Sequence, residues 1–88
     1  MIDRIKNKWD LIQNYTKDNF DIPDIVFDTW ILPLKPLKIS KDAEGNLVLD
    51  ILGNGDETTK NHVQTRYGLF LSAAIEEVVN IKCKVNIC

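Results

Sequence analysis

The sequence has few of the residues on which enzymatic and metal sites usually depend. It contains one histidine, His62, and two cysteines, Cys83 and Cys88, among 88 residues. Catalysis by the usual triads needs a histidine beside a nucleophile, and nothing marks a partner for His62. The cysteines show neither a CxxC motif nor a metal-ligand spacing. We therefore expect no enzyme, no metal and no cofactor, and a His62 on the surface of a helix.

Long apolar runs and a strong excess of charge are also missing. No segment approaches the roughly 20 apolar residues of a membrane span, and the start "MIDRIKNKWD" has no signal-peptide core. The net charge of −2 argues against nucleic-acid binding by the whole surface, because such binding neutralises phosphates. These absences favour a cytoplasmic protein that does not contact a membrane, and they leave a local basic patch open.

The two cysteines are not expected to form a disulfide. If Cys83 lies in a strand, the odd offset to Cys88 points the two side chains to opposite faces, and we interpret Cys83 as a small core residue. The chain ends in an apparent strand, "KVNIC". We therefore expect residues 1–88 to be one domain, the N-terminal piece of a longer protein.

The first third of the sequence has helical periodicity. Apolar residues three or four positions apart predict a helix over about residues 2–18. Its apolar arc is wide, so we expect one side to pack on the core and the other to form a spare edge; these sides are Leu11, Ile12 and Tyr15, and Ile2, Ile5 and Trp9. "NFDIPD" predicts a break with Asp21 as a cap, then a mostly buried helix over residues 23–32 that Pro33 ends.

Period-two alternation dominates the rest of the sequence. Leu37 and Ile39 alternate with polar residues and predict a strand, which Pro36 places at a sheet edge or makes begin late. "KDAEGN" predicts a turn to a second strand at residues 47–51. Asp56 as N-cap and Asn80 as stop predict a long helix over residues 57–79, and a last strand follows with Ile81, Cys83, Val85 and Ile87 facing inward.

The element order is α-α-β-β-α-β, which predicts an α+β domain with a three-stranded sheet packed with three helices. A long helix joins the second and third strands, so these two strands are expected to pair in parallel. The loop "GNGD" before that helix is interpreted as a simple turn, since Asp56 would repel a phosphate bound there.

Several motifs fall in an order known from one family. An early tryptophan stands in "NKWDLI", Phe27 and Trp30 precede "LPL", and Arg66 and Tyr67 stand in "QTRYGLFLSAAIEEV". With these motifs, nearly the whole chain resembles the N-terminal domain of bacterial chromosomal replication initiators of the DnaA family. The resemblance implies a KH-like fold and a non-catalytic domain. It also implies that ATP binds only in a later ATPase domain, which this sequence does not include.

The resemblance further implies partners and contact positions. Family members use this domain to contact the replicative helicase and initiation regulators, to self-associate and, in some cases, to bind single-stranded DNA weakly. Val26 and Thr58 occupy positions associated with helicase or regulator contacts, although relatives carry a polar or acidic residue at the first and an apolar residue at the second. We therefore predict an interaction module; the alternative is a KH-like module for single-stranded nucleic acid.

The remaining candidates have two interpretations each. Ile2, Ile5 and Trp9 form either an exposed anchor for partners or part of the core, whereas Phe27 and Trp30 are interpreted as core. Lys82 and Lys84 are the candidates for contact with single-stranded DNA. They belong to a predicted basic stripe whose alternative is a solvated face that guards an edge strand; the stripe comprises Lys35, Lys38, Lys41, Lys82 and Lys84.

Overall fold

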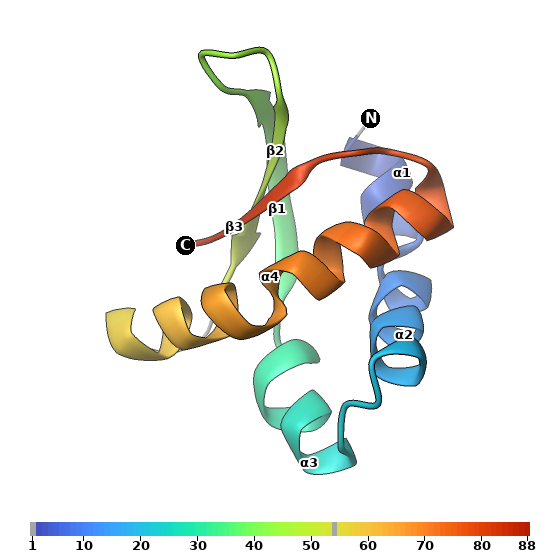
Figure 1. Ribbon diagram of the computed structural model, residues 1–88, viewed down its shortest axis with the longest axis vertical. Coiled ribbons are helices and arrows are strands. Elements are labelled where there is room, and N and C mark those ends of the chain that lie inside the picture. The colour runs from blue at the N-terminus through green and yellow to red at the C-terminus, as the bar shows by residue number, and fades with distance from the viewer. Residues whose placement is uncertain (1, 54) are drawn as a thin grey trace.

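The computed structural model describes residues 2–53 and 55–88 and has the predicted α+β architecture. The elements, shown in Figure 1, are α1 (Ile2–Asn7), α2 (Trp9–Asn19), α3 (Asp24–Val26), the π-helix η1 (Phe27–Ile31), β1 (Lys35–Lys41), β2 (Leu47–Leu52), α4 (Glu57–Val79) and β3 (Lys84–Ile87). The predicted order is confirmed, with α1 and α2 in place of the first predicted helix and α3 and η1 in place of the second. The interpretation of "GNGD" as a simple turn involves Asn54, which lies outside the described residues.

The three strands form one mixed sheet in the order β1-β2-β3. β1 is antiparallel to β2 and β3 is parallel to β2, as predicted. Pro36 lies in an edge strand, also as predicted, because a proline cannot complete a central ladder. The register changes between Pro36 and Lys38, so Leu37 is the extra residue of a bulge. The bulge interrupts the alternation on which the strand was predicted, and Leu37 is 42% exposed.

The long helix α4 begins and ends at the predicted residues. The Asp56 carboxylate accepts a hydrogen bond from the Thr59 backbone N–H at 2.9 Å, and this bond lowers the pKa of Asp56. Asn80 adopts a left-handed conformation (φ 59°), and its N–H donates to the Glu76 carbonyl oxygen. Both caps satisfy backbone groups that a helix end leaves free. In Figure 1, α4 runs across the front of the sheet, with α1 and α2 beside it.

The predicted division of the first helix is only partly right: Ile12 is buried and Tyr15 packs against the core, as expected, but the other edge is not spare. The helix is interrupted at Lys8, and the buried stripe runs through Ile5, Trp9, Ile12 and Thr16 at spacings of one helical turn. Leu11, which was expected to contact the core, is 53% exposed. The inner face instead carries hydrogen-bond donors, because buried carbonyl groups there need partners. The Trp9 indole donates to the Leu34 carbonyl oxygen, and Gln13, one turn later, donates to that of Ile31.

The start of the second predicted helix also differs from the prediction. Asp21 has a positive φ of 50° and does not cap; Pro23 is the residue that precedes α3. The last turns are wider than an α-helix, because the Leu32 N–H donates to the Phe27 carbonyl oxygen five residues back. The helix was expected to be mostly buried, and Phe27 and Ile31 are, but Ile25 is 75% exposed.

The last strand packs as the alternation predicted. Ile81, Cys83, Val85 and Ile87 are all buried, although β3 itself begins at Lys84. Cys83 and the exposed Cys88 are both free thiols, so the predicted absence of a disulfide between them is confirmed. Burial raises the pKa of the Cys83 thiol. It is therefore a core residue, as expected, and not a reactive thiol.

Candidate functional site

Trp9 is not the exposed anchor that the sequence suggested. It is only 8% exposed, and its indole Nε1–H donates to the Leu34 carbonyl oxygen at 2.8 Å. Ile5 is completely buried, and Ile2 is half-buried against the core. Trp9 is held inside because its indole N–H finds its hydrogen-bond acceptor, the Leu34 carbonyl oxygen, in the segment between η1 and β1. A contact role for these three residues remains a prediction, with Ile2 the most accessible of them.

One edge of Trp9 still reaches a surface hollow. This hollow, of about 420 Å³, lies between α1, α2 and the start of β1, and Lys6, Asp10, Leu32 and Pro36 help to line it. Trp9 forms part of its wall while remaining almost inaccessible. A partner would therefore meet the hollow rather than the indole.

Trp30 takes the more accessible position. It is half-buried, and its ring lies 5.6 Å from the His62 imidazole at an interplanar angle of 58°. His62 is exposed on α4, as predicted, whereas the interpretation of Trp30 as a fully buried core residue is only partly right. Phe27, by contrast, is buried as expected, with the Lys17 ammonium 5.1 Å from its ring centroid. Trp30 thus joins η1 to α4 at the surface.

Val26 and Thr58 lie on the two sides of this junction. Val26 is half-buried in α3, one helical turn before Trp30. Thr58 is exposed in the first turn of α4, one turn before His62. The Trp30–His62 contact therefore places both predicted contact positions beside one seam. A contact role for Val26 and Thr58 remains a prediction.

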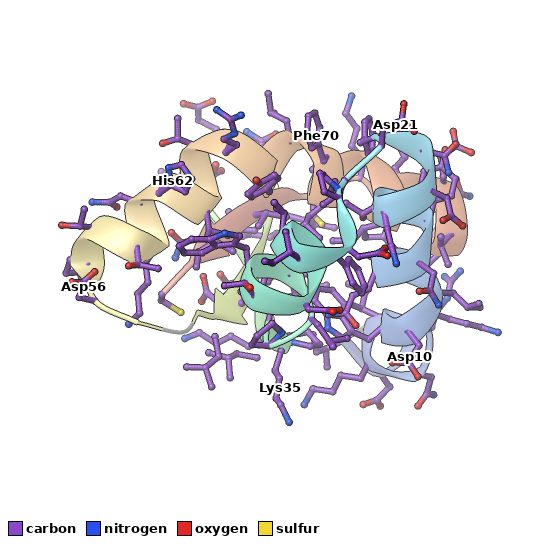
Figure 2. The ribbon with its side chains drawn as sticks, turned by 90° about the horizontal axis from the view of Figure 1, so that it is seen from below. Asp10, Asp21, Lys35, Asp56, His62 and Phe70 are labelled. Carbon is purple, nitrogen blue, oxygen red and sulfur yellow. The ribbon has the colours of Figure 1, made fainter. Side chains whose placement is uncertain are left out.

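A second hollow continues this seam and was not predicted. It lies between the α2–α3 loop and α4, has a volume of about 560 Å³, and is lined by Phe20, Asp21, Ile22, Pro23, His62, Thr65, Arg66, Tyr67 and Phe70. Figure 2 shows Asp21 beside Phe70 at one end and His62 farther along α4. Phe20 and Phe70 stack at 4.3 Å with an angle of 7° between the rings. We call this the α4 hollow.

Sequence reasoning missed the α4 hollow because its two walls are far apart in the chain. Arg66 and Tyr67 had been noted only as part of the family motif, and the loop at "NFDIPD" only as a break. Nothing in their local pattern indicates that Phe20 stacks on Phe70. The Arg66-Tyr67 motif was the one available signal. Adjacent residues on a helix point in different directions, so Tyr67 can pack inward while Arg66 stays at the surface.

The charges around the α4 hollow are mixed. Arg66 and Asp21 line it, and close by the Lys17 ammonium pairs with the Asp24 carboxylate at 2.7 Å. The hydrogen bond of this pair lowers the pKa of Asp24 and raises the pKa of Lys17. Asp24 is exposed and Lys17 is only partly buried, so the pair orients the loop more than it stabilises the fold.

The predicted basic stripe is divided by the fold. Lys35, Lys38 and Lys41 lie on β1, while Lys82 and Lys84 lie in or beside β3, at the opposite edge of the sheet. The central strand between them carries Asp50, which is the register partner of Lys38.

The β3 lysines also have acidic neighbours. The Lys84 ammonium lies 3.6 Å from the Asp42 carboxylate, and Glu76 lines the same hollow as Lys82 and Lys84. The backbone hydrogen bond from Asn46 is the main cause that lowers the pKa of Asp42. The proposed contact of Lys82 and Lys84 with single-stranded DNA remains a prediction.

Within residues 2–53 and 55–88, no three metal-ligating side chains come together. In the same part of the chain, no helix is both long and apolar enough to cross a bilayer.

Comparison with known proteins gives one clear similarity. No family model matches the sequence. The chain is 32% identical over 76 residues to the chromosomal replication initiator protein DnaA of Lachnoclostridium phytofermentans. The aligned part is 86% of this chain but 16% of that initiator. The similarity agrees with the resemblance to an N-terminal initiator domain, and the chain spans about a sixth of the length of the curated relative it matches.

Proposed function

We propose that this domain is the protein-interaction module of a chromosomal replication initiator. In this role it contacts the replicative helicase, initiation regulators and other copies of the initiator in the cytoplasm, and it has no chemistry or cofactor of its own. The observation that carries the proposal is the similarity to a DnaA protein over 86% of this chain. ATP binding would belong to a different domain of the whole protein.

The Trp30–His62 seam and the α4 hollow are the surface that suits a protein partner best. Aromatic side chains there are neither fully buried nor fully exposed: Trp30 and Phe70 are both half-buried. Polar side chains surround them, among them Thr65 and Arg66, which are exposed. An apolar centre with a polar rim is the usual anatomy of a protein interface. Val26 and Thr58, beside the seam, would lie at its margin.

Self-association would use a different part of the domain. Ile2 and the hollow beside Trp9 lie where α1 and α2 meet β1. Trp9 would contribute by shaping that hollow, since its indole is held inside by the bond to Leu34. A partner residue that enters the hollow would contact Leu32 and Pro36, which are more accessible.

The helicase contact can be tested with one exposed residue. Arg66→Glu reverses the cation of the α4 hollow without removing any packed group, so its melting temperature should stay within a few degrees of wild type. Binding of the cognate replicative helicase, measured by calorimetry, should weaken about tenfold, because the reversed charge faces the partner beside the apolar centre and arginine is enriched among binding hot spots. Lys82→Glu is the matched control and should bind normally. Equal binding by both variants and wild type would remove the α4 hollow from the proposal.

A salt titration separates this function from the nucleic-acid alternative. The interaction module should bind a single-stranded oligonucleotide weakly, with a dissociation constant no tighter than about micromolar at physiological salt. Tighter binding that is lost in Lys82→Glu and Lys84→Glu would favour the KH-like nucleic-acid module. The acidic neighbours Asp42 and Glu76 lead us to expect the weak result.

A further inference from the structure

The two edges of the sheet are finished in different ways. The outer edge of β3 is closed by α4: the Gln64 side chain donates from Nε2 to the Val85 carbonyl oxygen at 2.8 Å and accepts at Oε1 from the Ile87 N–H at 2.7 Å. One carboxamide thus makes the two bonds that a neighbouring peptide group would make. The Ser72 hydroxyl donates to the Cys83 carbonyl oxygen just before the strand. β3 therefore has no place for another strand.

The outer edge of β1 has no such cover. About half of the N–H and C=O groups of an edge strand point away from the sheet. In the described part of the chain, no hydrogen bond from outside the β1–β2 ladder reaches the backbone of Lys35–Lys41. No residue of β1 is buried: five are exposed and two are half-buried. Figure 2 shows Lys35 projecting from the side of the molecule opposite α4. This edge is free to pair.

A hollow of about 410 Å³ follows the same edge. It is lined by four consecutive β1 residues, numbers 38–41, together with Ile2 of α1 and Leu47 of β2. Side chains of consecutive strand residues alternate between the two faces, so a cavity that touches all four reaches the edge of the strand, while Leu47, the ladder partner of Lys41, and Ile2 of α1 place its floor on the sheet. Ile2, Ile39 and Leu47 give it an apolar wall. An added strand would place one apolar side chain in it.

The charges of this edge indicate which kind of strand fits. β1 reads KPLKISK, with three exposed lysines and no acidic residue of its own. Two acidic residues lie nearby on other elements: Asp50 of β2 is opposite Lys38, and Asp10 of α2 lines a hollow with Lys35. Edge lysines keep uncharged strands away, and two β1 edges paired with each other would bring lysines against lysines. An extended segment with carboxylates at alternating positions is not repelled by the lysines and neutralises their charge.

We propose that the outer edge of β1 binds an extended acidic segment of a partner protein by strand addition. Backbone hydrogen bonds supply the pairing, the carboxylates face Lys35, Lys38 and Lys41, and one apolar side chain enters the hollow beside Ile2. A peptide fits better than single-stranded nucleic acid, because unpaired N–H and C=O groups alternate along β1 and no aromatic residue of β1 is available to stack on a base. The proposal stands on this edge alone and does not require the proposed function.

The test uses the 88-residue chain labelled with ¹⁵N and a capped nonapeptide, Thr-Glu-Val-Glu-Val-Glu-Val-Glu-Thr. The peptide should shift the amide resonances of residues 35–41 and slow hydrogen exchange of the β1 amides that do not pair with β2. Two control peptides are decisive. Replacing every Glu by Lys should abolish binding, and methylating every internal amide nitrogen should do the same because it removes the donors while keeping the carboxylates.

Variants of the protein locate the contact. Lys38→Glu with Lys41→Glu should weaken peptide binding about tenfold or more through lost charge complementarity, whereas Lys82→Glu should bind like wild type. Strand addition is overturned if the methylated peptide binds as well as the parent, if no binding is seen at millimolar peptide, or if the shifts map away from β1. Tighter binding of a twelve-nucleotide oligothymidylate at residues 35–41 would assign the edge to nucleic acid instead. If the double variant does not fold, the methylated peptide still decides with the wild-type chain.

Discussion

The regions around Trp9 and Trp30 contain the same kind of side chain in opposite situations. Trp9 is almost inaccessible, and its indole N–H is bonded to the Leu34 carbonyl oxygen. Trp30 is half-buried and touches the exposed His62 from one side. Trp9 joins α2 to the segment that leads into the sheet, while Trp30 joins η1 to α4 at the surface. A tryptophan with a specific buried partner for its N–H belongs to the fold, and one without such a partner is free to take part in binding.

Gln13 strengthens this contrast. Its carboxamide donates to the carbonyl oxygens of Ile31 and Leu32, at 2.9 and 3.3 Å. Together with Trp9, it satisfies three carbonyl groups at the end of η1 and in the turn that follows. The Trp9 region is therefore a polar joint inside the core, where removal of a donor also leaves a carbonyl group unpaired. The Trp30 region contains no such joint among the residues described.

The largest expected effect is that of Trp9→Ala. The substitution removes a buried aromatic ring and the donor for Leu34, so we expect the free energy of unfolding to fall by about 3–5 kcal/mol. Urea denaturation monitored by circular dichroism measures it. Trp9→Phe is the control: it keeps most of the packing and should cost only about 1–2 kcal/mol through the lost hydrogen bond. A Trp9→Ala protein as stable as wild type would place Trp9 at the surface after all.

A smaller effect is expected for Trp30→Ala. Trp30 is only partly buried, so its loss should lower the free energy of unfolding by less than the loss of Trp9, about 1–2 kcal/mol. If the proposed function is right, the same substitution should also weaken binding of the helicase, because it removes the aromatic centre of the seam with His62. Thermal melts and calorimetric titrations of the two alanine variants give the comparison directly. If Trp30→Ala destabilises the domain more than Trp9→Ala, then Trp30 rather than Trp9 is the tryptophan that stabilises the fold.

The smallest effect is a pH dependence from the ion pair that joins α2 to α3. The folded-state pKa of Asp24 is lowered by Lys17, so the stability from this pair is present above pH about 4 and is lost as the pH falls through the lowered value. The pKa of Lys17 is raised, so the same contribution is also lost when the pH rises through that value in strong alkali. Asp24→Asn should remove the acid-side dependence.

Single-tryptophan variants read out this pH effect. Trp9→Phe leaves as the reporter Trp30, which follows the paired Asp24 after about one and a half turns of helix, and Trp30→Phe leaves Trp9, which precedes the paired Lys17 by more than two turns. Between pH 5 and pH 3, about the range in which an exposed carboxylate titrates, fluorescence should change more for Trp30 than for Trp9. Equal changes from both tryptophans would mean that the pair acts on the whole domain.

Much of the fold could be predicted because its signals are local. Asp56 and Asn80 mark the ends of α4 through their own backbone and side-chain chemistry, and both predictions are confirmed. Alternation in the last strand correctly predicted that Val85 and its three companions are buried. Parallel pairing of β2 with β3 followed from the length of the connecting helix. These features depend on neighbours within a few residues or on the reach of the chain.

The candidate site was less predictable because it is made by distant segments. Periodicity alone could not choose which side of a wide apolar arc faces inward, so Leu11 was placed inside and Trp9 at an accessible edge. The choice was made by carbonyl groups more than twenty residues away from Trp9, which require donors. For the same reason the α4 hollow and the stack of Phe20 on Phe70 had no sequence signal.

The sequence by itself determined the element types, their order, the caps of α4, the buried face of the last strand and the resemblance to a replication initiator. The tertiary structure alone decided which tryptophan is buried, how the lysines divide between two sheet edges, and which edge stays open. The physical reason is range. Helix caps and alternation depend on neighbouring residues, whereas burial and hydrogen-bond satisfaction depend on which distant backbone groups come to lie against a side chain. Gln64 illustrates this: only its position against Val85 and Ile87 makes a polar helix residue the cover of a strand.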